Sequence, residues 1–119
     1  MSNKTFEATL RHPVLHFDGA VIIDLHGEIN GSVDAALNMA FEEAEAQNPE
    51  NIILNFTNVD YINSTGIALI VGLLARARKA RRTLTVFGLS EHYRHIFELT
   101  RLNEAIGVYD SEAEALAAA

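Results

Sequence analysis

Residues 51–67 constrain the fold of this chain more than any other segment. Residues 51–56 form a short apolar run of the kind that makes a buried strand, and a polar loop follows. Ser64-Thr65-Gly66 then precedes apolar residues at helical spacing, which predicts a helix from Ser64 to about Arg81. The segment therefore predicts a strand–loop–helix unit, and such units build α/β folds through crossover connections.

The same alternation of strands and helices continues along the chain. Strands are predicted over residues 5–10, 14–17, 20–26, 51–56, 83–87 and 106–109. Ser32, Ser90 and Ser111 are predicted to cap helices, the first of which ends near Gln47, and a further helix is predicted to begin at Ser64. Neither a linker nor a repeat divides these 119 residues, so we expect one domain over residues 1–119, with its core at about 5–116.

Composition excludes several functional classes. The formal net charge of −7 argues against nucleic-acid binding, and the absence of cysteine excludes disulfides and thiolate chemistry. The N-terminus lacks the apolar run of a signal peptide, and no apolar stretch reaches the roughly 20 residues of a membrane helix. We therefore expect a cytoplasmic protein that does not associate with membranes.

The sequence offers no constellation of catalytic or metal-binding residues. Its five histidines lack the spacing of a metal site, and Ser64 lacks the Gly-x-Ser-x-Gly surroundings of a hydrolase nucleophile. One glycine after Ser64-Thr65 is too little for a phosphate-binding loop. The chain is thus predicted to be neither an enzyme nor a cofactor-binding protein.

Ser64 lies where a helix N-terminus presents unpaired backbone N–H groups and favours negative charge. A serine at this position acts as a helix cap, as a phosphate acceptor, or as both. Spacing alone favours the cap. Thr65 is the alternative acceptor.

The predicted helix is apolar on two sides. The side expected to face the sheet carries Ile67, Ile70, Val71 and Leu74, and the opposite side carries Leu69, Gly72, Leu73 and Arg76. Two leucines beside a glycine on an outer face indicate either a docking surface or cover by another helix of the same domain. Both interpretations remain open at this level.

Several of these residues resemble the pattern of the STAS domain, in particular the free-standing anti-sigma factor antagonists of bacteria. The similar residues are Gly27-Glu28-Ile29, the strand at 52–56, Val59-Asp60-Tyr61-Ile62 and Ser64-Thr65-Gly66-Ile67. The match in element order extends from about Thr5 to Leu116. The resemblance implies a four- to five-stranded mixed sheet with helices packed largely on one face.

The resemblance also implies a partner-switching cycle. In such a cycle the unmodified protein binds an anti-sigma factor, itself a serine kinase with a histidine-kinase-like ATPase fold, and so releases a sigma factor. The kinase phosphorylates the serine that matches Ser64, which abolishes binding, and a metal-dependent serine phosphatase reverses the modification. The partner surface is then expected to comprise Asn30, Asn63, Ser64, Thr65, Leu69, Leu73 and Arg76.

Two positions depart from the family pattern. Asn30 and Asn63 stand where family members commonly have aspartates. Amides remove repulsion against a phosphate at Ser64, and they equally remove acidic contacts that a kinase would use. This leaves two alternatives: a constitutive, phosphorylation-insensitive STAS interaction module, and a domain that binds an anion or nucleotide at the helix N-terminus.

Overall fold

A single mixed β-sheet forms the centre of the computed structural model, which describes residues 5–12 and 19–118. The strands lie in chain order and are β1 (Glu7–Arg11), β2 (Ala20–Ile29), β3 (Asn51–Ile62), β4 (Thr83–Phe87) and β5 (Gly107–Tyr109). β1 is antiparallel to β2, whereas β2, β3, β4 and β5 run parallel to one another. The predicted mixed α/β sheet is confirmed, with five strands; the strand predicted over residues 14–17 lies outside the described residues.

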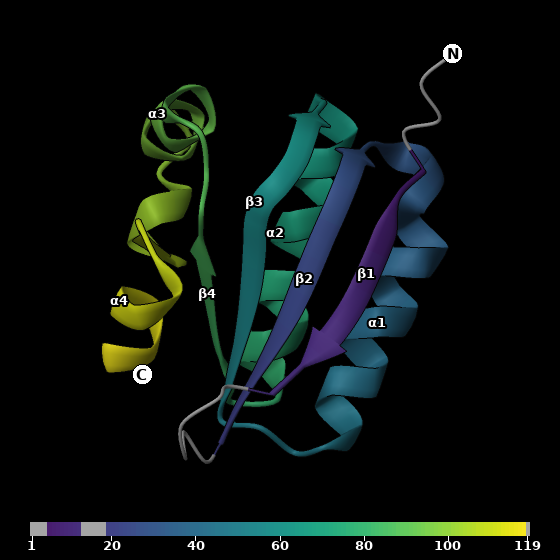
Figure 1. Ribbon diagram of the computed structural model, residues 1–119, viewed down its shortest axis with the longest axis vertical. Coiled ribbons are helices and arrows are strands. Elements are labelled where there is room, and N and C mark those ends of the chain that lie inside the picture. The colour runs from purple at the N-terminus through teal and green to yellow at the C-terminus, as the bar shows by residue number, and fades with distance from the viewer. Residues whose placement is uncertain (1–4, 13–18, 119) are drawn as a thin grey trace.

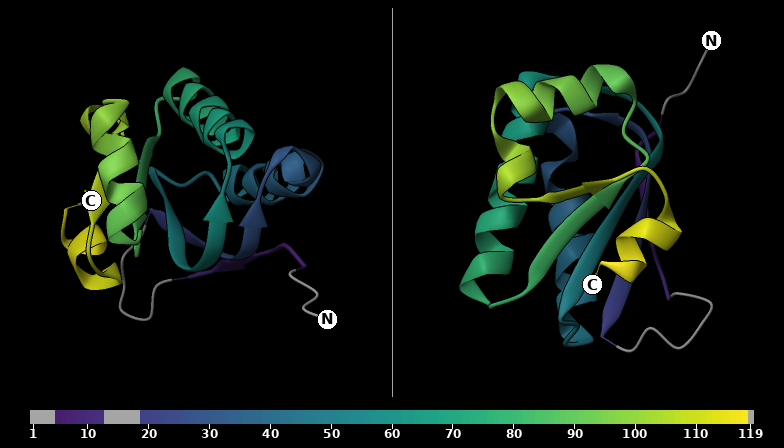
Figure 2. Two further views of the ribbon diagram at one scale, coloured as in Figure 1. Left: turned by 90° about the horizontal axis from the view of Figure 1, so that it is seen from above. Right: turned by 90° about the vertical axis from the view of Figure 1, so that its left-hand side faces the viewer.

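The helices cover the two faces of the sheet unequally (Figures 1 and 2). They are α1 (Asp34–Ala46), α2 (Ser64–Lys79), α3 (Glu91–Leu99) and α4 (Glu112–Ala117), with short 3-10 turns at η1 (Gly31–Val33) and η2 (Leu102–Glu104). α1 and α2 lie side by side on one face, and α4 packs on the other. No helix in the described part of the chain is long and apolar enough to cross a membrane.

Successive side chains of a strand point to opposite faces of the sheet, which explains how β2 and β3 pack against helices on both faces. Ile23 and Leu54 belong to the larger apolar cluster beneath α1 and α2. Ile22 and Ile53, one residue earlier in each strand, belong to the smaller cluster that Leu116 of α4 closes. All four isoleucine and leucine side chains of β2 and β3 named here have no exposed surface. Strands buried on both faces are typical of a parallel sheet covered by helices.

An ion-pair network ties α4 to the sheet. The Arg11 guanidinium donates to Asp24 at 2.8 and 3.0 Å and to Glu112 at 2.7 and 3.2 Å. The side chain of Asn55 donates to the same Asp24 carboxylate at 2.8 Å. The hydrogen bonds from Arg11 are the main reason that the pKa of Asp24 lies below its ordinary value.

β2 and β3 are both longer than predicted, because their polar C-terminal parts continue as strands. β2 runs on through Gly27, which adopts a φ of +99° at an irregularity in its pairing with β3. β3 extends beyond β4, whose last residue, Phe87, pairs with Asn55. The end of β3 therefore pairs with β2 alone, and its exposed polar residues gave it the pattern of a loop.

The outer face of α2 also differs from the prediction. Leu73 was expected on the outer face but is only 1% exposed, whereas Val71 was expected against the sheet and is 42% exposed. α2 contacts α1 as well as β3 and β4, because the two helices share one face of the sheet, so part of the side expected to lie outward is covered. Gly66, Ile70, Leu73, Leu74 and Ala77 form that buried side. Of the two interpretations of the apolar outer face, cover within the domain is correct for Leu73.

Candidate functional site around Ser64

The candidate site lies where the parallel strands β2 and β3 end. Ile29 and Ile62, the last residues of these strands, are register partners, and both are buried. Asn30 and Asn63 follow directly, and the backbone N–H of Asn63 donates to the Ile29 carbonyl at 3.2 Å. The structure thus brings Asn30, Asn63, Ser64 and Thr65 to one edge of the sheet, at the starts of η1 and α2. Figure 1 shows that β2 and β3 end side by side at this edge.

Two asparagine side chains cap the helical segments at this edge. The Asn63 amide oxygen accepts a hydrogen bond from the Gly66 N–H at 2.8 Å. The Asn30 amide oxygen accepts from the Ser32 N–H at 2.9 Å and from the Ser32 hydroxyl at 2.5 Å. The predictions that Ser64 and Ser32 are caps are therefore wrong. Asparagine caps as well as serine does, so Asn63, directly before Ser64, and Asn30, two residues before Ser32, were equally good candidates.

Gly66 explains why the first turn of α2 fits against β2. A Cβ atom at this position would lie 2.2 Å from the Ile29 carbonyl oxygen and 3.0 Å from the Ile62 side chain. Only glycine allows this close approach of helix and strand. The Ser-Thr-Gly sequence therefore reflects a packing constraint at its third residue as well as any function at its first.

Ser64 is the first residue of α2 and is exposed. Within the described residues its hydroxyl makes no hydrogen bond, since Asn63 has taken the capping position. Thr65 is also exposed, but its methyl group lies against Gly31, where an added Cβ would come within 3.1 Å of it. Of these two residues, Ser64 therefore has the fewer contacts that stabilise the fold.

The other residues predicted to contact a partner differ in their exposure and in their distance from Ser64. Leu69 is half-buried, and Leu73 lies in the core, so the prediction that Leu73 contacts a partner is wrong. Arg76 lies about 18 Å along α2 from Ser64, by the 1.5 Å rise per residue. Its guanidinium donates to Asn38 and Glu45 of α1, at 2.8 Å each, and lies 5.1 Å from the centre of the Phe41 ring. Arg76 therefore serves the packing of α2 on α1.

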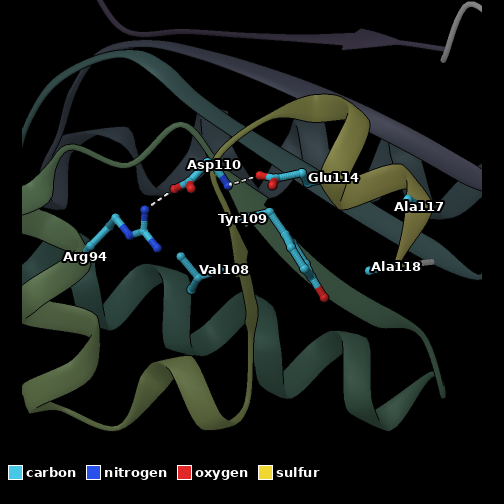
Figure 3. Close-up of a pocket in the computed structure, with 7 residues that line it drawn as sticks. All are labelled: Arg94, Val108, Tyr109, Asp110, Glu114, Ala117 and Ala118. Carbon is cyan, nitrogen blue, oxygen red and sulfur yellow. Dashed lines mark hydrogen bonds and ion pairs between the residues drawn. The ribbon is translucent and has the colours of Figure 1, made fainter.

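The described chain contains no group of three or more histidine, aspartate or glutamate side chains suited to a metal ion. His16 lies outside the described residues. A shallow hollow of about 460 Å³ lies between α3, β5 and α4 (Figure 3). Its Arg94 side chain forms an ion pair with Asp110, whose backbone N–H donates to Glu114. None of the residues lining this hollow comes from the edge that carries Ser64.

The sequence of this chain matches one known protein family and several of its characterised members. A model of the STAS domain family matches residues 12–115. An anti-sigma-B factor antagonist of Listeria monocytogenes is 30% identical over 88 residues, which are 74% of this chain and 77% of that protein. An anti-sigma F factor antagonist of Paenibacillus polymyxa is 24% identical over 102 residues, or 85% of this chain and 87% of that protein.

Solved structures show the same fold at lower sequence identity. An anti-sigma factor antagonist from Mycobacterium paratuberculosis superimposes with a TM-score of 0.81 at 20% identity, covering 98% of this chain and 96% of that one. The phosphorylated form of the Bacillus cell-fate determinant SpoIIAA superimposes with a TM-score of 0.68 at 21% identity, covering 92% and 96%. The five-stranded sheet with four helices is thus the fold of these proteins.

Proposed function

The chain belongs to the STAS domain family, and from this premise we propose that it is an anti-sigma factor antagonist whose binding is switched off by phosphorylation of Ser64. In this cycle the unmodified protein binds an anti-sigma factor that is itself a serine kinase with a histidine-kinase-like ATPase fold, and a sigma factor is released. A metal-dependent serine phosphatase restores the unmodified protein. The names of the relatives in Listeria and Paenibacillus support the antagonist role.

The proposal depends mainly on one observation: within the described residues the Ser64 hydroxyl makes no hydrogen bond. It is exposed at the head of α2, while Asn63 supplies the cap that a serine would otherwise provide. Phosphorylation of Ser64 would therefore leave the cap in place. A phosphate there adds about −1.5 to −2 charge beside the unpaired N–H groups of the first turn, where the helix dipole favours an anion.

A partner surface adjoins this hydroxyl on the exposed side of α2. Ala68, Val71, Gly72 and Ala75 follow Ser64 at helical spacing and are exposed. Apart from its chain neighbours and the adjoining backbone of α2, no atom of the described residues lies within 4 Å of the point where a Cβ of Gly72 would be, so a partner can approach the helix closely there. We assign to the surface Asn30, Asn63, Ser64, Thr65 and Leu69 together with this exposed side, with Arg76 at its margin.

The switch then operates through surface electrostatics. A partner seated on the exposed side of α2 would have to desolvate a dianion at the head of the helix or lose contact with it. A loss of ~3 kcal/mol of binding free energy weakens a complex by a little over a hundredfold. The fold itself does not have to change, because a helix N-terminus accommodates phosphate.

The proposal is tested by capture from a lysate of the source cells with four baits: wild type, Ser64→Ala, Ser64→Asp and Ser111→Asp. Ser111 caps α4, where aspartate caps equally well, so Ser111→Asp adds the same charge at another helix start. We expect every bait except Ser64→Asp to retain a histidine-kinase-like ATPase.

Equal capture by all four baits would contradict the switch and favour a constitutive interaction module. Capture of no such ATPase by any bait would contradict the antagonist role. A phosphate-bearing ligand that then raised thermal stability with its concentration would favour the anion-binding alternative.

A further inference from the structure

The end of β3 depends on side chains for part of its hydrogen bonding. β4 stops at Phe87, opposite Asn55, so within the described residues the rest of β3 pairs with no strand on that side of the sheet. Buried backbone groups that lose a strand partner need another one. The side-chain oxygen of Asn55 accepts from the Thr57 N–H at 3.0 Å, and the Tyr93 hydroxyl accepts from the Ile62 N–H at 2.9 Å.

Tyr93 reaches Ile62 from the first turn of α3. Its side chain is 8% exposed, and Ile62 is 4% exposed, so the hydrogen bond between them is shielded from water. The ring meets that of His92 edge-on at 4.9 Å, and the Ser90 hydroxyl accepts from the Tyr93 N–H at 3.4 Å. These contacts hold the Tyr93 hydroxyl on the backbone immediately before Asn63.

Three hydrogen bonds hold the backbone on either side of Ser64. Ile62 donates to Tyr93, Asn63 donates to the Ile29 carbonyl at 3.2 Å, and Gly66 donates to the Asn63 side chain at 2.8 Å. The second and third belong to the strand end and to the helix cap. Of these three, only the first connects the segment to α3.

We propose that Tyr93 is a positioning residue for Ser64, and that α3 thereby controls how Ser64 and the cap at Asn63 are presented to the partner kinase. The inference rests on the proposed function. Tyr93 is buried, and in this proposal it acts on Ser64 through the Ile62 amide. Its removal is expected to loosen the Asn63 cap and to raise the cost of ordering the segment in the complex.

The test is Tyr93→Phe, which removes only the hydroxyl oxygen. Amide hydrogen exchange followed by NMR should show about tenfold faster exchange at both Ile62 and Gly66, in keeping with the loss of one buried hydrogen bond. The Kd for the ATPase captured by the wild-type bait should rise about five- to tenfold under conditions where the variant is folded.

Two control variants separate positioning from general destabilisation. Tyr109→Phe removes a hydroxyl that makes no hydrogen bond within the described residues. Leu116→Ala weakens the apolar cluster beneath α4, on the opposite face of the sheet. In both variants the exchange rate of the Gly66 amide, relative to that of neighbouring α2 amides, should equal the wild-type ratio. The Kd for the ATPase should also be unchanged.

Faster exchange at Ile62 with unchanged exchange at Gly66 would overturn the inference, and so would a Kd equal to that of wild type. If wild type itself binds no such ATPase, the proposed function fails. The exchange at Gly66 in Tyr93→Phe would then still decide whether Tyr93 positions the Ser64 segment.

Discussion

The side chain of Asn63 accepts a hydrogen bond from the backbone N–H of Gly66 at 2.8 Å, so the residue before Ser64 caps α2. This relationship separates two roles that the sequence had placed on one serine. Asn63 stabilises the start of the helix, and the exposed Ser64 hydroxyl remains available for phosphorylation. Substitutions at the two positions should therefore have different consequences.

Asn63→Ala should lower the free energy of unfolding by about 1 kcal/mol, because it leaves the Gly66 N–H without its acceptor. Asn63→Asp keeps the accepting oxygen and should be close to wild type in stability. Ser64→Ala should change stability by less than about 0.5 kcal/mol, as is usual for an exposed side chain without a partner. Urea unfolding of the three variants measures these differences. A larger loss for Ser64→Ala than for Asn63→Ala would show that the cap is assigned wrongly.

Gly66→Ala and Gly72→Ala place the same methyl group on one helix and should have opposite effects. The new Cβ at Gly66 would lie 2.2 Å from the Ile29 carbonyl oxygen, so the start of α2 must move away from β2. We expect a loss of about 3 kcal/mol or more, a size reserved for overpacking and strain. At Gly72 the methyl group enters open space, and the better helix propensity of alanine should add about 0.5–1 kcal/mol. Thermal unfolding checks both, and a stable Gly66→Ala protein would contradict the close approach.

The Arg11–Asp24 pair should give the protein an acid-sensitive component of stability. The pKa of Asp24 is lowered in the folded state, mainly by the hydrogen bonds from Arg11. A carboxylate with a lowered folded-state pKa stabilises the fold above its unfolded-state pKa of about 4, and this contribution is lost as the pH falls through the folded-state pKa. Stability should therefore fall below about pH 4.

Arg11→Met tests the origin of this acid sensitivity. The variant should be less stable than wild type at pH 7, and the difference between the two should shrink as the pH falls from 4 toward 2. The size is modest, since both side chains are about a third exposed. Urea unfolding at a series of pH values provides the measurement. A difference that stayed constant with pH would mean that the Asp24 charge plays no part.

Arg76→Met should weaken the packing of α2 on α1. The substitution removes hydrogen bonds to Asn38 and Glu45 and the contact with the Phe41 ring, at a cost of about 1–2 kcal/mol. Affinity for the captured ATPase should fall by less than about threefold, because this guanidinium is already engaged within the domain. Calorimetry of the folded variant measures that affinity. A loss of tenfold or more would make Arg76 a central partner contact.

Most of the fold could be predicted from the sequence because it depends on local pattern. Apolar runs such as 51–56 and 83–87 became strands, and Ser90 and Ser111 are the caps of α3 and α4 as predicted. The polar ends of β2 and β3 could not be recognised, since their pairing partner is a distant strand and not a neighbouring residue. The orientation of α2 was missed for a similar reason, because only the position of α1 decides which side is covered.

The candidate site was predictable in its residues and less so in its roles. Asn30, Asn63, Ser64 and Thr65 are together at one edge, as parallel strand ends require. Which of two adjacent polar residues caps a helix depends on the backbone geometry at the turn, which composition does not report. Tyr93 had no signal in the sequence, because its link to Ile62 spans 31 residues and depends on one hydroxyl.

The phosphorylation switch at Ser64 can be measured by comparing the affinity of one partner for two chemically defined forms of the protein. Calorimetry with the captured ATPase should be carried out on wild type and on protein that carries phosphate at Ser64, both in the same buffer and salt. We expect binding at least about a hundredfold weaker for the phosphorylated form, equivalent to ~3 kcal/mol. Equal Kd values for the two forms would contradict the switch.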